Sequence, residues 1–223
     1  MEALKRFFIR PPFAKRFILM LVGVIAMGVC VAFLDLTDLG TDPYSALNLG
    51  LSRITPISFG TWELLVNGLL LIIVLFFDKS KLGLGTVGNM VVIGYTKDFV
   101  SFILEKYFSL TVITDLKWRI IVMLIAVFFF IVAVALYVNA GLGSSAYDAL
   151  PYVIHSKLNK VMKKGVRFSV VRILFDLFFT LVAYLIKGEA GIITVIMVFT
   201  LGPMIELMSK IVSKVFKIDN DLS

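Results

Sequence analysis

Charged residues are scarce in this 223-residue sequence: Asp, Glu, Lys and Arg make up 17%, against 60% hydrophobic residues. A soluble domain has about a quarter charged residues, and a chain this apolar would expose more hydrophobic surface than a soluble monomer tolerates. The same hydrophobicity excludes a disordered chain, because disorder requires few apolar residues. The composition therefore predicts an integral membrane protein and excludes soluble enzyme folds.

Cysteine and histidine are almost absent. Cys30 lies in an apolar run and His155 in a basic segment, and each is the only residue of its type. One cysteine excludes an internal disulfide and a cysteine-based metal cluster, and one histidine excludes an HExxH zinc site. The sequence also contains no phosphate-binding loop and offers no nucleophile–base pair. We therefore expect no enzymatic activity, no metal and no cofactor.

Long apolar runs are plentiful, and they predict an all-α polytopic membrane protein. A bilayer core of ~30 Å needs ~20 mainly apolar helical residues, whereas a transmembrane barrel has ~10-residue alternating strands. Met1–Lys15 is expected to form an amphipathic lead-in at the membrane surface. The six transmembrane helices are expected at Arg16–Leu34, Thr61–Phe77, Leu84–Leu104, Arg119–Asn139, Phe168–Ile186 and Ala190–Ile211.

Basic residues are unevenly distributed among the loops. With a cytoplasmic N-terminus, fifteen of the 22 Lys and Arg residues fall on the cytoplasmic side and five outside, while Lys97 and Arg172 lie within spans. This bias follows the positive-inside rule and predicts that both termini are cytoplasmic. It also accounts for the net charge of +7 without nucleic-acid binding. We expect the cluster Lys157–Arg167 to contact anionic lipid headgroups.

The two halves of the sequence repeat each other. Leu39–Leu47 is identical to Leu142–Leu150 at five of nine positions, and Gly83–Thr86 aligns with Gly191–Thr194. Each half has three spans, so two tandem copies enter the membrane from opposite sides. The pattern predicts one membrane domain of two inverted three-helix repeats, as in many secondary transporters, although an old duplication that left only a packing scaffold would give the same pattern. The repeats are expected at about 16–104 and 119–211.

Each repeat has a short extra helix after its first span. Asp42 and Ser145 are suited to cap the N-termini of these helices. The helices could dip inward and present free N–H groups to an anion, or lie flat at the interface. Tyr44 and Tyr147 favour the interface, because tyrosine prefers the headgroup level. The short helices are expected at about 43–52 and 146–158.

Charged side chains within spans are costly and usually paired. Because they lie at matching depths, we expect Glu63 to pair with Lys97 near the outer side and Arg172 to pair with Glu206 near the inner side. Such pairs can simply fasten neighbouring helices, or they can act as a gate or a proton-coupled pair.

Two further polar residues occupy equivalent positions nearer the midplane. Asn67 and Asp176 each lie one helical turn deeper than the charged residue before them. A carboxylate without an evident partner at this depth is a candidate substrate or proton site, and Asn89 is a third candidate for this path. The alternative is that Asp176 takes part in a hydrogen bond to a neighbouring backbone carbonyl or to Asn89.

Four motifs occur in order along the chain: Leu39–Ser52, Ser58–Trp62, Gly83–Met90 and Gly143–Leu150. In these motifs the sequence resembles the bacterial YczE/YyaS/YitT family of small integral membrane proteins. The resemblance spans about residues 16–212 and implies a bacterial cytoplasmic-membrane protein. The sequence departs from the family pattern at Ser145-Ala146, where a proline would be more typical.

The function that these features favour is transport of an unidentified small solute, with ion coupling as an option. A substrate-binding membrane subunit of a larger transporter and a non-transporting accessory protein are the alternatives. A central cavity lined by polar side chains of both repeats would favour transport. A cavity open only to the outside would favour the binding subunit, and a solid apolar interior would favour the accessory role.

Overall fold

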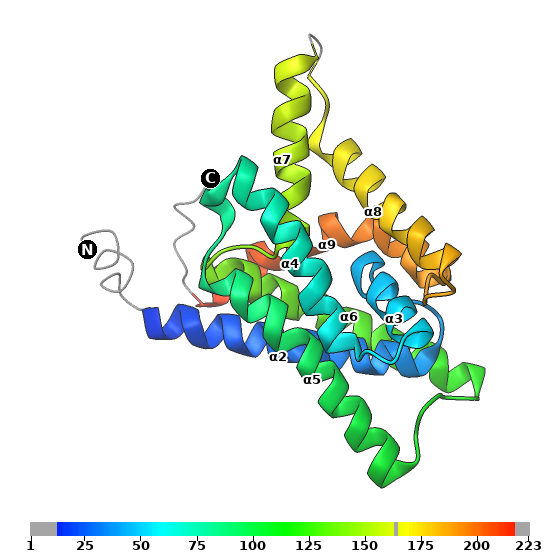
Figure 1. Ribbon diagram of the computed structural model, residues 1–223. Coiled ribbons are helices and arrows are strands. Elements are labelled where there is room, and N and C mark those ends of the chain that lie inside the picture. Colours follow the sequence, from blue (N-terminus) through cyan, green and yellow to red (C-terminus); the bar gives the residue numbers. More distant parts are fainter. Residues whose placement is uncertain (1–12, 163–164, 217–223) are drawn as a thin grey trace.

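The computed structural model describes residues 13–162 and 165–216, which form an all-helical bundle (Figure 1). Six of the helices are long and apolar enough to cross a membrane, which confirms the predicted spans. The lead-in predicted over Met1–Lys15 lies mostly outside the described residues. The long helices are α2 (Phe13–Thr37), α4 (Phe59–Phe77), α5 (Leu84–Phe108), α6 (Leu116–Ala140), α8 (Phe168–Leu185) and α9 (Ile192–Phe216). The short ones are α3 (Pro43–Ile54), the 3₁₀ turn η1 (Lys79–Lys81) and α7 (Ala146–Val161).

Several long helices extend beyond their apolar cores. α5 was expected to end at Leu104 but continues to Phe108. It ends where Ser109 adopts a left-handed conformation with φ of 51°, and the Ser109 N–H bonds the carbonyl of Glu105 at 3.0 Å. Hydropathy alone places a helix end too early, because polar residues continue the helical hydrogen bonding.

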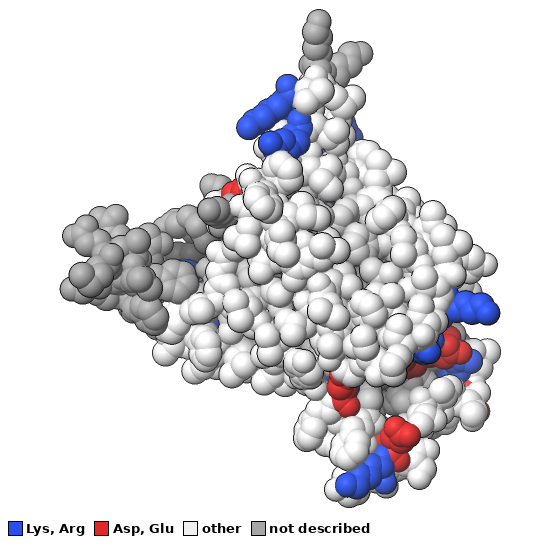
Figure 2. Space-filling model, in the orientation of Figure 1, with Lys and Arg blue, Asp and Glu red and all other residues white. Residues whose placement is uncertain are grey.

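The outer surface of the bundle is strongly apolar. Phe76 and Leu185 are 82% and 71% exposed, and similar side chains cover all six long helices. In Figure 2, a broad uncharged band separates the charged side chains gathered toward the extremities. Contiguous apolar surface of this extent is stable only against lipid or another protein, as expected for a multi-pass membrane protein.

The helices of the N-terminal half (α2–α5) and the C-terminal half (α6–α9) interlock. α2 packs along α6, while α5 covers α2 and α9 covers α6. Gly23 allows the close approach of α2 and α6, because a Cβ there would lie 2.8 Å from the carbonyl oxygen of Ala133. α3 packs against α8, and α7 packs against α4. Each short helix is therefore held by the second span of the other half.

Two Leu-Gly turns dock the halves onto each other. The carbonyl of Leu142 accepts a hydrogen bond from the N–H of Gly85 at 2.7 Å, and the carbonyl of Leu39 accepts one from Ile193 at 3.3 Å. The glycine after each leucine has a positive φ, 107° and 111° respectively, which disfavours other residues. Each turn thus lies against the N-terminus of the third span of the other half.

The two tyrosines expected to reach the headgroup level are buried inside the protein. Tyr44 and Tyr147 are only 8% and 5% exposed and lie in one buried cluster with Phe179. Their hydroxyl groups find polar partners inside the protein instead of headgroups: Tyr44 donates to the carbonyl of Glu63, and Tyr147 donates to Asp176. A buried tyrosine with a bonded hydroxyl needs no wet interface.

Candidate functional site

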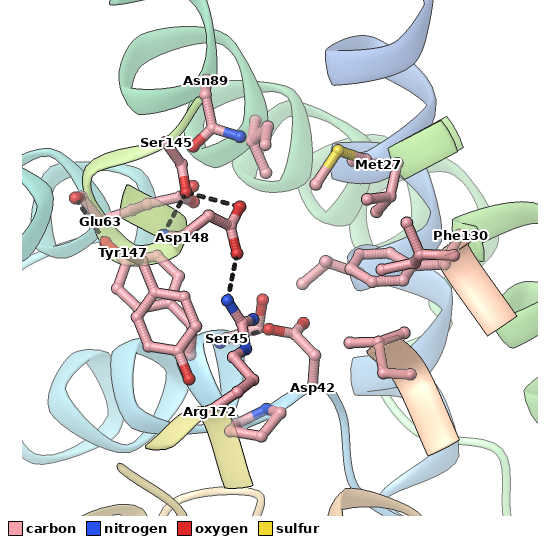
Figure 3. A pocket seen from close by; sticks show the side chains of 17 residues that line it. Met27, Asp42, Ser45, Glu63, Asn89, Phe130, Ser145, Tyr147, Asp148 and Arg172 are labelled. Carbon is pink, nitrogen blue, oxygen red and sulfur yellow. Dashed lines mark hydrogen bonds and ion pairs between the residues drawn. The ribbon is translucent and has the colours of Figure 1, made fainter. Parts of the chain in front are cut away.

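A cavity of about 60 Å³ lies between the N-termini of α3 and α7 (Figure 3). This volume has room for a few water molecules or a small ion, because one water needs roughly 10–15 Å³ measured in this way. Apolar residues of α2, α6 and α9, such as Val31, Phe130 and Leu201, line one side. Apart from two tyrosines, the polar and charged side chains that line the cavity come from both halves. The N-terminal half contributes Asp42, Ser45, Glu63 and Asn89, and the C-terminal half contributes Ser145, Asp148 and Arg172.

The caps of the two short helices bring their polar groups to this cavity. The Asp42 carboxylate accepts a hydrogen bond from the N–H of Ser45 at 3.1 Å, and the Ser145 hydroxyl accepts one from the N–H of Asp148 at 3.0 Å. Asp42 and Ser145 therefore occupy the N-cap positions at which the sequence places them. Because both helices begin here, two positive helix ends face the same small space.

Arg172 joins three residues beside the cavity. Its Nη1 lies 2.9 Å from Asp148 and its Nε lies 3.0 Å from Asp176, while the guanidinium group lies 5.2 Å from the centre of the Tyr147 ring. The Tyr147 hydroxyl also donates to Asp176. Figure 3 shows the Asp148 carboxylate held between Ser145 and Arg172. The positive charge of Arg172 is thus occupied by two carboxylates and is not free to bind an anion.

Two other carboxylates keep an oxygen without a partner. Among the described residues, Asp42 Oδ2 and Glu63 Oε2 are buried and make no hydrogen bond. Tyr44 reaches Glu63 only at its backbone carbonyl, at 3.0 Å. Asp42 is 7% exposed and Glu63 is 2% exposed, and both line the cavity. Leaving buried carboxylate oxygens unsatisfied is costly, so these two groups are suited to bind a cation or a proton.

A second polar cluster lies at the C-terminal end of α3. Arg53, at the end of α3, contacts Asp35 at 3.1 Å and also Glu189 in the loop between α8 and α9. Lys97 of α5 lies 2.8 Å from the other oxygen of Asp35. Burial, with the nearby charge of Asp35, raises the pKa of Glu189 to about 9 against the pull of Arg53. The cluster ties the end of α2 to α3, to α5 and to the C-terminal half.

The comparisons with known sequences agree with this membrane architecture. The family of unknown function DUF6198 matches residues 14–210. The chain belongs to this family.

Curated relatives of this DUF6198 member come from two bacteria. The uncharacterized protein YyaS of Bacillus subtilis is 26% identical over 87% of this chain and 92% of its own length. The uncharacterized membrane protein YczE of the same organism is 29% identical over 60% of this chain and 59% of its own length. An uncharacterized protein of Haemophilus influenzae is 24% identical over 90% of this chain and 86% of its own length. The resemblance seen in the motifs is thereby confirmed, and no solved structure matches.

Both ion pairs expected from depth in this DUF6198 chain are wrong. Lys97 binds Asp35 instead of Glu63, because α5 packs against α2 and brings Lys97 to the end of that helix. Arg172 binds Asp148 and Asp176 instead of Glu206. Glu206 lies on an outward face of α9, where its 71% exposed side chain pairs with Lys210.

The three candidate path residues have different surroundings. Asn89 lines the cavity. Asp176 lies behind it, and its carboxylate is bound by Tyr147 and Arg172 instead of a backbone carbonyl or Asn89. Asn67 is fully buried, and neither polar atom of its amide has a partner among the described residues, but it is not part of the cavity lining.

Asp148 is a site residue that was not predicted from the sequence. It stands three residues after the cap Ser145, and the two side chains bond each other at 2.8 Å. A serine followed three residues later by an acidic residue is the pattern of a helix N-terminal box, so this signal was present in Ser145-Ala-Tyr-Asp148. Glu189 was missed because it lies in a short loop between two spans, where depth arguments do not apply.

Proposed function

We propose that the protein is a small-solute transporter of the bacterial cytoplasmic membrane, built from two inverted three-helix repeats with their short half-helices meeting at the solute site. The single observation that carries the proposal is the cavity, because polar side chains of both halves converge on it. Inverted-repeat transporters bind their substrates at the interface of the repeats, where broken helices end.

The paired contacts of the two halves support the inverted arrangement. The Leu39 turn lies against the start of α9, and the Leu142 turn lies against the start of α5. α3 packs on α8 just as α7 packs on α4, and α5 covers α2 just as α9 covers α6. Each of these contacts has a counterpart with the roles of the halves exchanged, which is the property expected of a two-fold relation.

We assign the cytoplasmic side to the end of the bundle where α7 approaches α8. Lys157, Lys160 and Arg167 lie on this segment, and basic residues concentrate on the cytoplasmic side. The same residues would contact anionic headgroups there. A green fluorescent protein fused to the C-terminus should therefore fluoresce, and a periplasmic alkaline phosphatase fusion at the same point should be inactive.

Alternating access can be tested without knowing the solute. Cys30 is replaced by Ala, and a single cysteine is introduced at Ser45 or at Leu201, which line the cavity from α3 and α9. The helix cap uses the backbone N–H of Ser45, which donates to Asp42, and the exchange replaces only the hydroxyl oxygen by sulfur, so Ser45→Cys should fold. A transporter predicts that a membrane-impermeant methanethiosulfonate reagent labels each cysteine in both right-side-out and inside-out vesicles, because the cavity opens in turn to each side.

The native protein is the matched control. Its Cys30 is buried in the hydrophobic core between α2 and its neighbours, at 6% exposure, and should not react from either side. Labelling of Ser45→Cys from the outside alone would instead favour a substrate-binding subunit. Absence of labelling from both sides in folded protein would favour an accessory role and overturn the transport proposal.

A further inference from the structure

The charges around the cavity do not balance, and the imbalance is negative. Four carboxylates, from Asp42, Glu63, Asp148 and Asp176, lie in or beside it, against the single guanidinium group of Arg172. The two helix N-termini add only about +0.5 elementary charge each. The site is therefore short of roughly two positive charges when all of these groups are ionised, and an anionic solute would meet net repulsion.

The unsatisfied oxygens show where a cation would bind. Arg172 forms ion pairs with the carboxylates of Asp148 and Asp176. Asp42 Oδ2 and Glu63 Oε2 are left without a partner among the described residues, on side chains that are more than nine-tenths buried. The Asn89 amide and the Ser45 hydroxyl line the same cavity and offer neutral oxygens. Carboxylate, amide and hydroxyl oxygens are the ligands of hard cations.

The size and composition of the site favour a monovalent cation. About 60 Å³ accommodates a small ion with one or two waters. Within the described ranges, no group of three or more His, Cys, Asp or Glu residues is placed to hold a metal ion. Ca²⁺ takes six to eight oxygen ligands, and Mg²⁺ gives up its water reluctantly. Two free carboxylate oxygens with neutral neighbours suit a partly dehydrated alkali ion.

We propose that Asp42 and Glu63, with Asn89 and Ser45 beside them, form a binding site for a monovalent cation of the Na⁺ type. The inference rests on the proposed function, in which this ion is the coupling ion or the transported solute. The site joins the cap of α3 to α4 and α5, so an occupying cation would hold the half-helix against the two spans that follow it.

The test measures the apparent Tm of the purified full chain in detergent. NaCl is exchanged for N-methyl-D-glucamine chloride at constant ionic strength and constant pH. At a Na⁺ concentration about ten times the Kd of the site, Na⁺ should raise the apparent Tm by roughly 3 °C or more. Glu63→Gln and Asp42→Asn should each lose this rise, and both should fold: Gln matches Glu in shape, and Asn is as good a helix N-cap as Asp.

Glu189→Gln is the matched control, because Glu189 is also a buried carboxylate but lies outside the cavity. This variant should keep the full Na⁺ response. Loss of the response in it, or persistence of the response in both cavity variants, would overturn the proposal. So would an unchanged Tm of the native chain, or a larger rise with Ca²⁺ or Mg²⁺ than with Na⁺.

Two further outcomes distinguish a failure of the Na⁺ proposal from a failure of the transport proposal. If Na⁺ has no effect but Glu63→Gln removes a pH dependence of the native Tm, the site holds a proton and the Na⁺ proposal falls. If Na⁺ stabilises the protein while Ser45→Cys is labelled from one side only, the cation site stands and the transport proposal falls.

Discussion

The rings of Tyr44 and Tyr147 lie against each other, with their centroids 4.8 Å apart. These residues hold equivalent positions in the two sequence repeats, and each begins a short helix that packs on the other half. Each hydroxyl group then donates to the second span of its own half. The pair therefore joins both short helices, α4 and α8 at one point next to the cavity.

The two tyrosine hydroxyl groups should contribute unequally to stability. Tyr147→Phe removes a hydrogen bond to the Asp176 carboxylate, which is worth roughly 1.5–3 kcal/mol, whereas Tyr44→Phe removes one to a neutral carbonyl, worth roughly 0.5–1.5 kcal/mol. We expect Tyr147→Phe to lower the apparent Tm more, as measured by thermal unfolding in detergent. Equal losses would show that Asp176 does not depend on this bond.

Arg172 should be the most sensitive charged residue of the bundle. Arg172→Gln leaves the partly exposed Asp148 and the buried Asp176 without their cation, and removing the partner of a buried charge costs up to roughly 3–5 kcal/mol. We expect a fall in the yield of folded protein, measured by fluorescence-detected size-exclusion chromatography.

The control for Arg172 is Glu206→Gln, which removes an exposed pair with Lys210. Exposed pairs contribute little, so this variant should give the native yield. A comparable loss in Glu206→Gln would restore the pairing that the sequence alone suggested for Arg172 and Glu206.

These contacts show where sequence reasoning succeeds and where it stops. The six spans and the caps Asp42 and Ser145 follow from local signals, because run length and capping chemistry depend on nearby residues. Ion pairs depend on which helices are neighbours. Matching depth made Glu63 and Lys97 plausible partners. α5 packs on both α4 and α2, and the Lys97 side chain binds Asp35 of α2.

The burial of Tyr44 and Tyr147 also depends on which helices are neighbours. Tyrosine is a residue type common at the membrane interface, and the local sequence gives no sign that Tyr44 and Tyr147 are buried. They are buried because α3 packs on α8 and α7 packs on α4. The cavity combines residues that are distant in sequence, such as Glu63 and Asp148. No local sequence pattern predicts that the helices carrying these residues lie next to each other.

Glu189 should make stability depend on pH. Its pKa is raised from 4.5 to about 9 by burial, so the folded state binds a proton more tightly than the unfolded state. This contribution is fully present below about pH 4.5 and is lost as pH rises toward 9. We therefore expect the apparent Tm of the native chain, relative to Glu189→Gln, to fall across this range. A difference that instead grows with pH would mean that Arg53 keeps Glu189 ionised.

The docking of the Leu39 turn should depend on the absence of a side chain at Gly191. A Cβ at this position would lie 2.1 Å from the carbonyl oxygen of Leu39. The obstacle is backbone and cannot rotate away, so Gly191→Ala should destabilise the protein by roughly 1–3 kcal/mol. The φ of Gly191 is not positive, so the loss would report the contact and not backbone strain.

Gly202→Ala gives the comparison within α9, the helix that begins directly after Gly191. A Cβ on Gly202 meets nothing within 4 Å, and alanine favours a helix interior over glycine by up to about 1 kcal/mol. Thermal unfolding should therefore show a lower Tm for Gly191→Ala and an equal or higher Tm for Gly202→Ala. If the two variants behave alike, the close approach of the Leu39 turn to α9 does not hold the halves together. Of the two paired turns, only the Leu142 turn would then support an inverted repeat.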